Sequence, residues 1–355
     1  MDVMTDALAA EFLRYAEHKG RAYSPTYGAL ARRLAGDDDM LQVAALTRTG
    51  PIVDLFFTCV RFLSRRRGDP LAGLMDQPVG DSPELYAAVR EFSLRERSAL
   101  GDLLHSRRLQ TNEPARAASL VLGLHHVVRA AGAVPVHLVE LGSSAGLQLL
   151  YPYFDYEFVR GGETIRLDAQ QAESGGAPPL IVTSVAGDGE LPGSIPVTAS
   201  RSGIDLDPLD ATVAEERLWL LSHIVPEETS RRALLEKALR LAAAVGPEIR
   251  RGDAVALLEE RLTGPGDGII CVYHSHVIGQ LGPANRERLR EVLTPAVASG
   301  RVVVLSLEGG RSAELPPAPA ERARQTYAGL RLTDRSGSRL LALAGSHGKW
   351  IQLLG

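Results

Sequence analysis

One stretch decides the fold, and it reads Val136-His137-Leu138-Val139-Glu140-Leu141-Gly142-Ser143-Ser144-Ala145-Gly146-Leu147. Its apolar first half is typical of a strand that is covered on both faces. Gly142 and Gly146 allow a tight turn that comes close to a ligand, and a helix is expected to begin at Ala145. In an open parallel sheet, a ligand binds beyond the carboxyl end of such a strand. Because the spacing is G-x-x-x-G and not the full G-x-G-x-x-G, a nucleoside site and a turn without a ligand both stay open.

The composition limits the classes of partner. The chain has 355 residues, 45% of them hydrophobic, and a formal net charge of −4. We expect neither nucleic acid nor membrane as a partner, because proteins that bind them usually carry a basic excess. The short clusters Arg65-Arg66-Arg67 and Arg107-Arg108 are either solvated helix ends or a phosphate-binding patch. The expected partner is a small-molecule substrate, and a protein partner or a homo-oligomer is left open.

The two cysteines favour a reducing compartment. Cys59 and Cys271 lie far apart in apolar runs, as buried thiols do, and zinc-type cysteine spacing is missing. No apolar run approaches the roughly 18 uninterrupted residues of a membrane span. We therefore expect a cytoplasmic protein.

Periodicity divides the chain into two regions. Apolar residues recur at three- and four-residue spacing from Thr5 to about Gly132, which predicts a run of helices. Residues 1–132 are therefore expected to form a helical cap domain. Residues 133–355 are expected to form an α/β domain, because buried strands alternate there with helical segments. A stretch rich in glycine and proline at about 161–200 is expected to be an insertion, in which a hairpin extends the site.

A polar run precedes the central strand, Gln110-Thr111-Asn112-Glu113-Pro114-Ala115-Arg116. Helix capping by Thr111 or Asn112 explains it without a ligand. In the alternative, Asn112, Glu113 and Arg116 face a ligand at the mouth of the strand. The aromatic run after the glycine turn mostly packs as core, and Tyr153 is its candidate for contact with a flat substrate ring.

Two aspartates follow expected strand ends. Asp205, in Gly203-Ile204-Asp205, has the position of an acid that accepts both hydroxyls of a ribose, although it lies 65 positions after Glu140 where about 20 is usual. An acidic turn is the alternative. Asp253, between Gly252 and a helix start, is either an acceptor for an exocyclic amine or a helix N-cap.

The strongest chemical feature is His274-Ser275-His276, at the carboxyl end of the apolar strand Gly268–Tyr273. Histidines at i and i+2 leave a strand on the same side, where they suit a general base, a hydrogen-bond donor or metal ligands. The further ligands that a metal needs are not identified, so no metal is expected. Structural imidazoles are the alternative. Of the two, His274 is expected to matter more for the reaction.

The remaining strands complete a sheet. A buried strand over Gly300–Gly310 contains Glu308 near its end. Strands near Leu330–Thr333, Arg339–Ala344 and Lys349–Leu353 are expected to form an antiparallel edge on a mostly parallel sheet.

These motifs carry a resemblance. Glu140 with its glycine turn, Gly203-Ile204-Asp205, Gly252-Asp253-Ala254 and His274-Ser275-His276 resemble the successive ligand-facing stations of class I S-adenosylmethionine-dependent methyltransferases. More closely, the polar run at 110–113, the glycine turn, residues 205–210, Tyr273-His274-Ser275-His276 and the terminal His347-Gly348-Lys349-Trp350 resemble a bacterial family catalogued as domain of unknown function 2332. The resemblance covers nearly the whole chain. It implies a helical N-terminal region followed by a Rossmann-like, methyltransferase-type domain.

The resemblance also implies roles. Glu140, Gly142 and Gly146, with Ser143 of the same turn, would hold the methionine and ribose side of S-adenosylmethionine. Asp205 would hold the ribose hydroxyls and Asp253 the adenine amine. The turn departs from the methyltransferase pattern, because Ser143-Ser144-Ala145 stands where another glycine is common.

Three functions follow as expectations. The first is methyl transfer from S-adenosylmethionine to an oxygen or nitrogen nucleophile of a small molecule, with His274, His276 and Glu113 as catalytic candidates. The substrate would contact Asn112, Arg116, Tyr153 and Tyr273. The second is a cyclisation or elimination on a biosynthetic intermediate in the same pocket without the cofactor, since a fold does not fix its chemistry. The third is a non-catalytic binding partner.

Overall fold

The computed structural model describes residues 3–48, 50–172, 176–264, 267–309, 314–322 and 325–354. The chain divides into two compact units, Met1–Thr111 with Val213–Ala233, and Asn112–Thr212 with Leu234–Gly355. This division differs from the expected boundary at residue 132. One reason is that α9 (Ala117–Ala131) packs on the strands of the second unit. The other is that α10 (Ala214–Ser222), far along the sequence, packs on α5 of the first unit.

The first unit is helical, as its spacing predicts. Ser24 and Ser82 cap α3 and α7, and each is followed by a proline at the first helical position. Most of α5 is buried, because apolar side chains cover most of its circumference, and its one polar face carries the buried Thr58 and Arg61. The helices are α1 (Val3–Tyr15), the π-helical turn η1 (Ala16–Gly20), α2 (Arg21–Tyr23), α3 (Pro25–Leu34), α4 (Asp38–Ala44), α5 (Ile52–Arg67), α6 (Leu71–Leu74), α7 (Pro83–Arg95) and α8 (Arg97–Ser106).

The second unit is built on a mixed, mostly parallel sheet, so the α/β class is confirmed. In the described part of the chain the strand order is β3-β2-β4-β11-β10-β9-β8-β7-β1-β5-β6. The strands are β1 (Val136–Leu141), β2 (Asp155–Arg160), β3 (Glu163–Leu167), β4 (Leu180–Ala186), β5 (Ser200–Asp205), β6 (Ile249–Arg251), β7 (Ile269–Ser275), β8 (Val302–Gly309), β9 (Tyr327–Asp334), β10 (Gly337–Gly345) and β11 (Trp350–Leu353).

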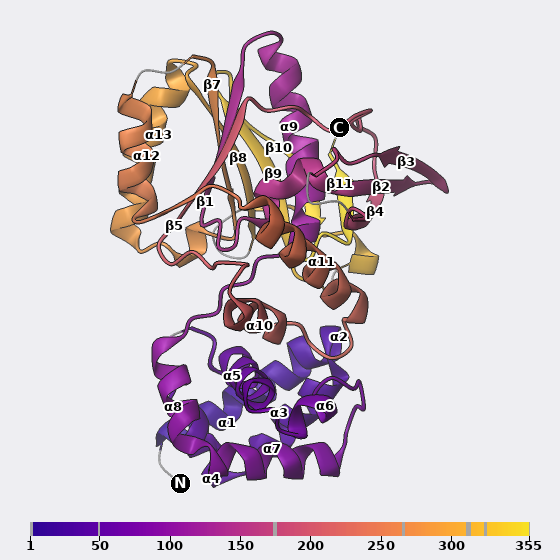
Figure 1. Cartoon of the computed structure of the whole chain (residues 1–355), viewed down its shortest axis with the longest axis vertical. Helices are drawn as coiled ribbons and strands as arrows, with labels where there is room; N and C mark the ends of the chain where they lie inside the picture. The colour runs from indigo at the N-terminus through magenta and orange to yellow at the C-terminus, as the bar shows by residue number, and fades with distance from the viewer. Residues whose placement is uncertain are drawn as a thin grey trace. The chain divides into compact units, whose positions relative to one another are not determined.

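Helices cover both faces of the parallel half of this sheet (Figure 1). On one face, α12 (Ala254–Thr263) and α13 (Pro283–Ala298) pack on a core that includes Val139, Ile204 and Val304. On the other face, Gly123 of α9 lies against the side chain of Leu305, the neighbour of Val304. Since successive side chains of a strand point to opposite faces, β8 is buried on both sides.

The antiparallel strands β9, β10 and β11 lie inside the sheet and do not form its edge, in contrast to the expectation. The strands β9, β10 and β11 follow β8 as a meander, and β4 then pairs with β11 in parallel. The segment between β1 and β5 therefore extends the sheet at its far end, where β2 and β3 form a hairpin.

The segment after the glycine turn also differs from the expectation. In place of an α-helix that begins at Ala145, it forms a 3₁₀-helix, η3 (Leu147–Tyr153). Pro152 lies inside this segment, and a proline disfavours the α conformation of the residue before it. Since β2 begins at Asp155, the chain turns back toward the sheet within two residues of η3.

Candidate functional site

The candidate site lies where the order of the parallel strands reverses. From β1 the chain proceeds outward through β5 and β6 on one side, and through β7 and β8 on the other. Open sheets bind ligands outside the carboxyl ends of the two strands at such a reversal, here β1 and β7. The segments that follow these two strands touch, because a Cβ atom at Gly142 would lie 2.5 Å from Cγ2 of Val277.

In the turn after β1, every second residue has a left-handed backbone conformation. Gly142, Ser144 and Gly146 have φ values of 69°, 52° and 67°. Only Ser144 carries a side chain, and this conformation costs a non-glycine residue on the order of 1–3 kcal/mol. Its N–H donates to Oδ2 of Asp205 over 2.7 Å, which holds the residue in place. Strain that is retained by a specific partner is typical of functional sites.

The N–H groups of this turn are largely engaged within the protein. Gly142 donates to the carbonyl of Ile204, and Gly146 to that of Ser143. Leu147 donates to Oδ1 of Asn112 over 2.9 Å. The buried Asn112 therefore holds the turn from the other side, and these N–H groups are not available to a phosphate.

Four buried polar atoms here have no hydrogen-bond partner among the described residues. They are Oε2 of Glu140, Oγ of Ser143, Oγ of Ser144 and Nε2 of His276. Glu140 is 2% exposed, at the end of β1. A buried polar atom without a partner destabilises a fold by about 1–3 kcal/mol, so such a group indicates a place where a ligand supplies the missing bonds.

The surroundings of Glu140 favour the neutral form of its carboxyl. Burial raises the pKa of its carboxyl well above the ordinary value, and the nearby charge of Asp205 acts in the same direction. Arg116 opposes both effects from the start of α9. A carboxyl held in this way ionises readily only when a positive group arrives beside it.

Three segments converge beside Arg116, which is itself buried. Its Nε donates to the carbonyl of Ser346 over 2.8 Å, and its Nη1 to Oγ of Ser275 over 3.4 Å. Glu113 is 2% exposed, and its Oε2 lies 3.7 Å from Nδ1 of His347. The polar run at 110–116, the end of β7 and the turn between β10 and β11 thus meet at one place.

Gly348 makes this convergence possible. It has a φ of 70°, and a Cβ atom on it would collide with the backbone carbonyl of Ala115. We therefore expect Gly348→Ala to lower the free energy of unfolding by about 1–3 kcal/mol. Gly337→Ala is the matched control, since its φ of 128° is also positive but nothing lies within 4 Å of the added atom. Urea unfolding measures both, and equal losses would contradict the close approach.

The sequence analysis missed the role of Glu308. Its Oε1 accepts a hydrogen bond from Nδ1 of His274 over 2.7 Å, and from the N–H groups of Val277 over 3.0 Å and Ile278 over 3.3 Å. These bonds lower the pKa of Glu308 in spite of its burial. The signal in the sequence was the position of Glu308 near the carboxyl end of its own strand. Because β7 and β8 pair in parallel, this position lies beside the histidines at the end of β7.

The features of a functional group are found at His276 rather than at His274. His276 has a φ of 56°, and its ring nitrogen Nε2 is buried without a partner among the described residues. Burial lowers its pKa to about 3, with Arg116 acting in the same direction. His276 is therefore neutral at pH 7, whereas His274 is held by Glu308.

A pH dependence of stability follows. In the unfolded chain His276 takes up a proton near pH 6.5, but in the folded chain only near 3, so its contribution to stability is present above pH 6.5 and is lost as the pH falls toward 3. The free energy of unfolding of His276→Asn should therefore fall less steeply between pH 6.5 and about 4. Asparagine tolerates a positive φ. His18→Asn, at an exposed histidine, is the control. Parallel pH profiles for wild type and His276→Asn would contradict the buried neutral ring.

The other predicted residues have structural partners. Both carboxylate oxygens of Asp205 accept backbone N–H groups, from Ser144 and Asp207. Asp253 is exposed and caps α12 through the N–H of Ala256. The fully buried Tyr273 donates its hydroxyl to Oε1 of Gln148, and the guanidinium group of Arg201 lies 5.7 Å from the ring of Tyr153.

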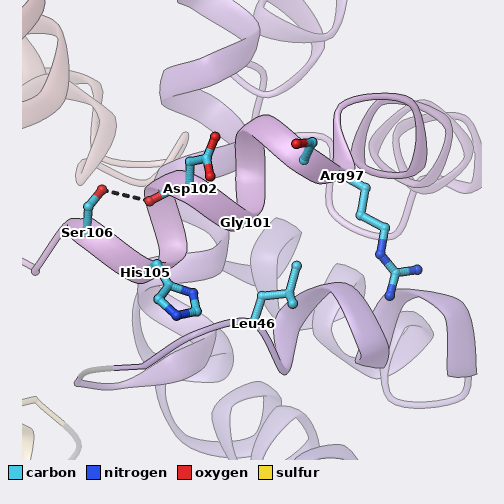
Figure 2. Close-up of a pocket in the computed structure, with 7 residues that line it drawn as sticks. Leu46, Arg97, Gly101, Asp102, His105 and Ser106 are labelled. Carbon is cyan, nitrogen blue, oxygen red and sulfur yellow. Dashed lines mark hydrogen bonds between the residues drawn. The ribbon is translucent and has the colours of Figure 1, made fainter.

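The first unit has a hollow of its own, with a volume of about 860 Å³. It is open, and Figure 2 shows the sparse lining, in which Ser106 bonds to the backbone of Asp102 within α8. The side chains that line it are those of Leu46, Arg97, Ser98, Asp102, His105 and Ser106, with Gly101. Since it has none of the buried, unpartnered groups found at the strand ends, we do not place the chemistry there.

The described residues hold neither a metal-binding cluster nor a helix suited to a membrane. They contain no group of three or more histidine, cysteine, aspartate or glutamate side chains that would hold a metal ion. Their helices include none with the length and apolarity needed to cross a membrane.

Comparison with known proteins identifies the family of the chain. No curated protein matches the chain. The family model described as an uncharacterized protein conserved in bacteria (DUF2332) matches residues 9–352. Because this match spans nearly the whole chain, the protein belongs to the DUF2332 family.

Proposed function

We propose that the carboxyl ends of β1 and β7 bind S-adenosylmethionine, and that the protein transfers its methyl group to an oxygen or nitrogen nucleophile of a small molecule. The observation that carries the proposal is the buried carboxyl of Glu140, with Oε2 lacking a partner among the described residues, at the point where the strand order reverses.

The donors and acceptors of the site match this cofactor. S-adenosylmethionine presents positive and donor groups, namely a sulfonium, an ammonium, two ribose hydroxyls and an adenine amine. Three neighbouring parallel strands offer a carboxyl group at their carboxyl ends. Glu140 lies near the end of β1, Asp205 ends β5, and Asp253 follows β6. Each oxygen of Asp205 that accepts an N–H keeps a further lone pair for a hydroxyl. A pyrophosphate, in contrast, requires the turn N–H groups that are already engaged.

The topology supports the same proposal. Numbered in chain order, the parallel strands run 3-2-1-4-5 from β6 to β8, which is the start of the doubly wound, Rossmann-like order. The 3₁₀-helix η3 and the meander β9–β11 are departures of this protein from that pattern. We infer a Rossmann-like, methyltransferase-type sheet with an altered closing half.

Positioning supplies much of the rate in this chemistry. The cofactor supplies an electrophilic methyl group, and an in-line displacement needs a well-oriented nucleophile. Neutral His276 orients that nucleophile by donating a hydrogen bond from its buried Nε2 to a lone pair of the nucleophilic atom. His274, which shares its Nδ1 proton with Glu308, presents Nε2 as the acceptor for the proton that leaves. Glu113 and Arg116 order the surrounding segments.

Isothermal titration with S-adenosylmethionine and its demethylated product tests the proposal. We expect saturable binding of both, and a higher melting temperature in their presence. NAD is the control ligand, because its pyrophosphate needs backbone N–H groups, and those of the turn after β1 are already engaged within the protein. No heat and no thermal shift at millimolar S-adenosylmethionine would refute it.

A second candidate function keeps the site without the cofactor. Burial raises the pKa of Glu140 and lowers that of His276, and titratable groups whose pKa values are shifted in opposite directions suit the roles of acid and base. This arrangement suits a cyclisation or elimination on a biosynthetic intermediate. Turnover of such an intermediate by protein stripped of S-adenosylmethionine would favour it over methyl transfer.

A further inference from the structure

Three arginines of the first unit converge on a single carboxylate oxygen. Arg61 and Arg65, one turn apart on α5, both donate from Nη2 to Oδ1 of Asp76, the first over 2.6 Å. Arg232, from α11 (Thr229–Val245), donates from Nη1 to the same oxygen over 2.9 Å. This arginine cluster, Arg61, Arg65 and Arg232, lies apart in sequence from every residue of the proposed methyl-transfer site.

The cluster has more buried donors than acceptors. The side chain of Arg61 is 1% exposed, and its Nε and Nη1 have no hydrogen-bond partner of good geometry among the described residues, although the buried hydroxyl of Tyr27 lies beside the guanidinium group. Nε of Arg65, whose side chain is 15% exposed, also has no hydrogen-bond partner among the described residues. Desolvated guanidinium donors strongly disfavour the folded state unless an acceptor meets them. The remaining exposure of Asp76, 35%, leaves a route from solvent to the cluster.

The charge is also unbalanced. Arg61 and Arg65 together carry two positive charges, and Asp76 is the carboxylate that both of them contact. Burial lowers the pKa of Arg65, and the charges of Arg232 and Arg61 act in the same direction against Asp76. Within this cluster, Arg61 and Arg65 share one carboxylate oxygen as the acceptor of their Nη2 groups, so two largely buried cations contact one partly buried anion.

We propose that the arginine cluster binds a phosphate group, either as inorganic phosphate or as the phosphate monoester of a small molecule. A phosphate carries about −1.5 to −2 charges at pH 7 and several acceptor oxygens. Guanidinium N–H groups form strong hydrogen bonds to such oxygens, so the free Nε of Arg65 and one of the two free nitrogens of Arg61 receive partners. Of the two basic clusters in the sequence, Arg65-Arg66-Arg67 thus contributes one residue to the site, together with Arg61 one turn earlier.

Titration of the full chain tests the proposal, with inorganic phosphate and methyl phosphate as probes and chloride at matched ionic strength as the reference. We expect saturable heat and a raised melting temperature with at least one of the phosphates. Binding of methyl phosphate identifies a monoester site, and binding of inorganic phosphate alone identifies a site for the free ion. No difference between both phosphates and chloride would overturn the proposal.

Variants separate this site from general charge effects. Arg65→Gln should weaken phosphate binding about tenfold or more, since hydrogen bonds to a charged group are lost. Arg66→Gln is the matched control, because Arg66 lies on the same helix but pairs with Glu215 on the surface. Equal affinities for wild type and Arg65→Gln would overturn the proposal.

Asp76→Asn covers the case in which Arg65→Gln fails to fold. It removes the competing carboxylate, so phosphate should bind several-fold more tightly and raise the melting temperature more than in wild type. A purely structural role of Asp76 predicts lower stability without any gain in affinity, and that result would overturn the proposal. Neither variant touches Glu140 or His276, so failure here leaves the proposed methyl transfer unaffected.

Discussion

Glu308→Ala is expected to lower the free energy of unfolding by about 3 kcal/mol or more, since three buried or partly buried donors lose their acceptor at about 1–3 kcal/mol each. One oxygen of Glu308 accepts bonds from His274, Val277 and Ile278, and the carboxylate is 6% exposed. Its removal leaves a buried imidazole and two N–H groups without an acceptor at the mouth of β7. Urea unfolding at pH 7 measures the loss.

Two controls make this result specific. Glu308→Gln keeps a carbonyl oxygen for the N–H groups of Val277 and Ile278, so it should retain part of the lost stability. Glu291→Ala, at an exposed position of α13, should change stability by no more than about 0.5 kcal/mol. If Glu308→Ala were as stable as Glu291→Ala, Glu308 would not organise the loop that carries His276.

Glu140→Gln is expected to weaken binding of S-adenosylmethionine about 10- to 100-fold while the protein stays folded. Glutamine resembles the neutral carboxyl that burial favours at this position, but it cannot ionise beside a positive ligand. Isothermal titration measures the affinity. Glu163→Gln, on the exposed strand β3, is the control and should bind as the wild type does.

The same variant has a predicted effect on stability. The folded pKa of Glu140 is raised, so its contribution is present below its unfolded value of 4.5 and is lost as the pH rises. Glutamine does not ionise, so Glu140→Gln does not lose this contribution as the pH rises. Its free energy of unfolding, compared with that of the wild type, should therefore increase between pH 5 and pH 8. Unchanged affinity, or a variant that loses stability as the pH rises, would contradict the role given to this carboxyl.

Hydrophobic runs allowed much of the fold to be predicted. The central strand was expected over residues 136–141 and forms β1 there, because an apolar run of this length between turn residues suits a strand covered on both faces. The strands that end at Asp205 and near His274 and Glu308 were found for the same reason. Local sequence decides such elements, since each buries its own side chains.

Long-range pairing could not be predicted. The strand β6 has three residues, Ile249–Arg251, and owes its conformation to β5 beside it. The pairing of β4 with β11 joins residues that are more than 160 positions apart, which no local pattern records. The position of α10 in the first unit could not be predicted either. Its apolar residues predict a helix that packs on a partner, but they do not specify which helix that partner is.

The candidate site was predictable in its residue types but not in its partners. The sequence identified Glu140, His276 and Arg116 because polar side chains stood at the ends of apolar runs. It could not reveal that Asn112 accepts the N–H of Leu147 in the turn, or that Glu308 accepts a hydrogen bond from His274. These bonds depend on which strands are neighbours, and that order appears only in the folded sheet.

A crystal structure of the protein grown with S-adenosylhomocysteine, the demethylated product, tests the central claim most directly. The account predicts the ligand outside the carboxyl ends of β1 and β7, with a donor group of the ligand within hydrogen-bond distance of Oε2 of Glu140. It also predicts that the Asp205 carboxylate keeps its bond to Ser144. Ligand bound elsewhere, with Glu140 still buried and unpartnered, would contradict the account.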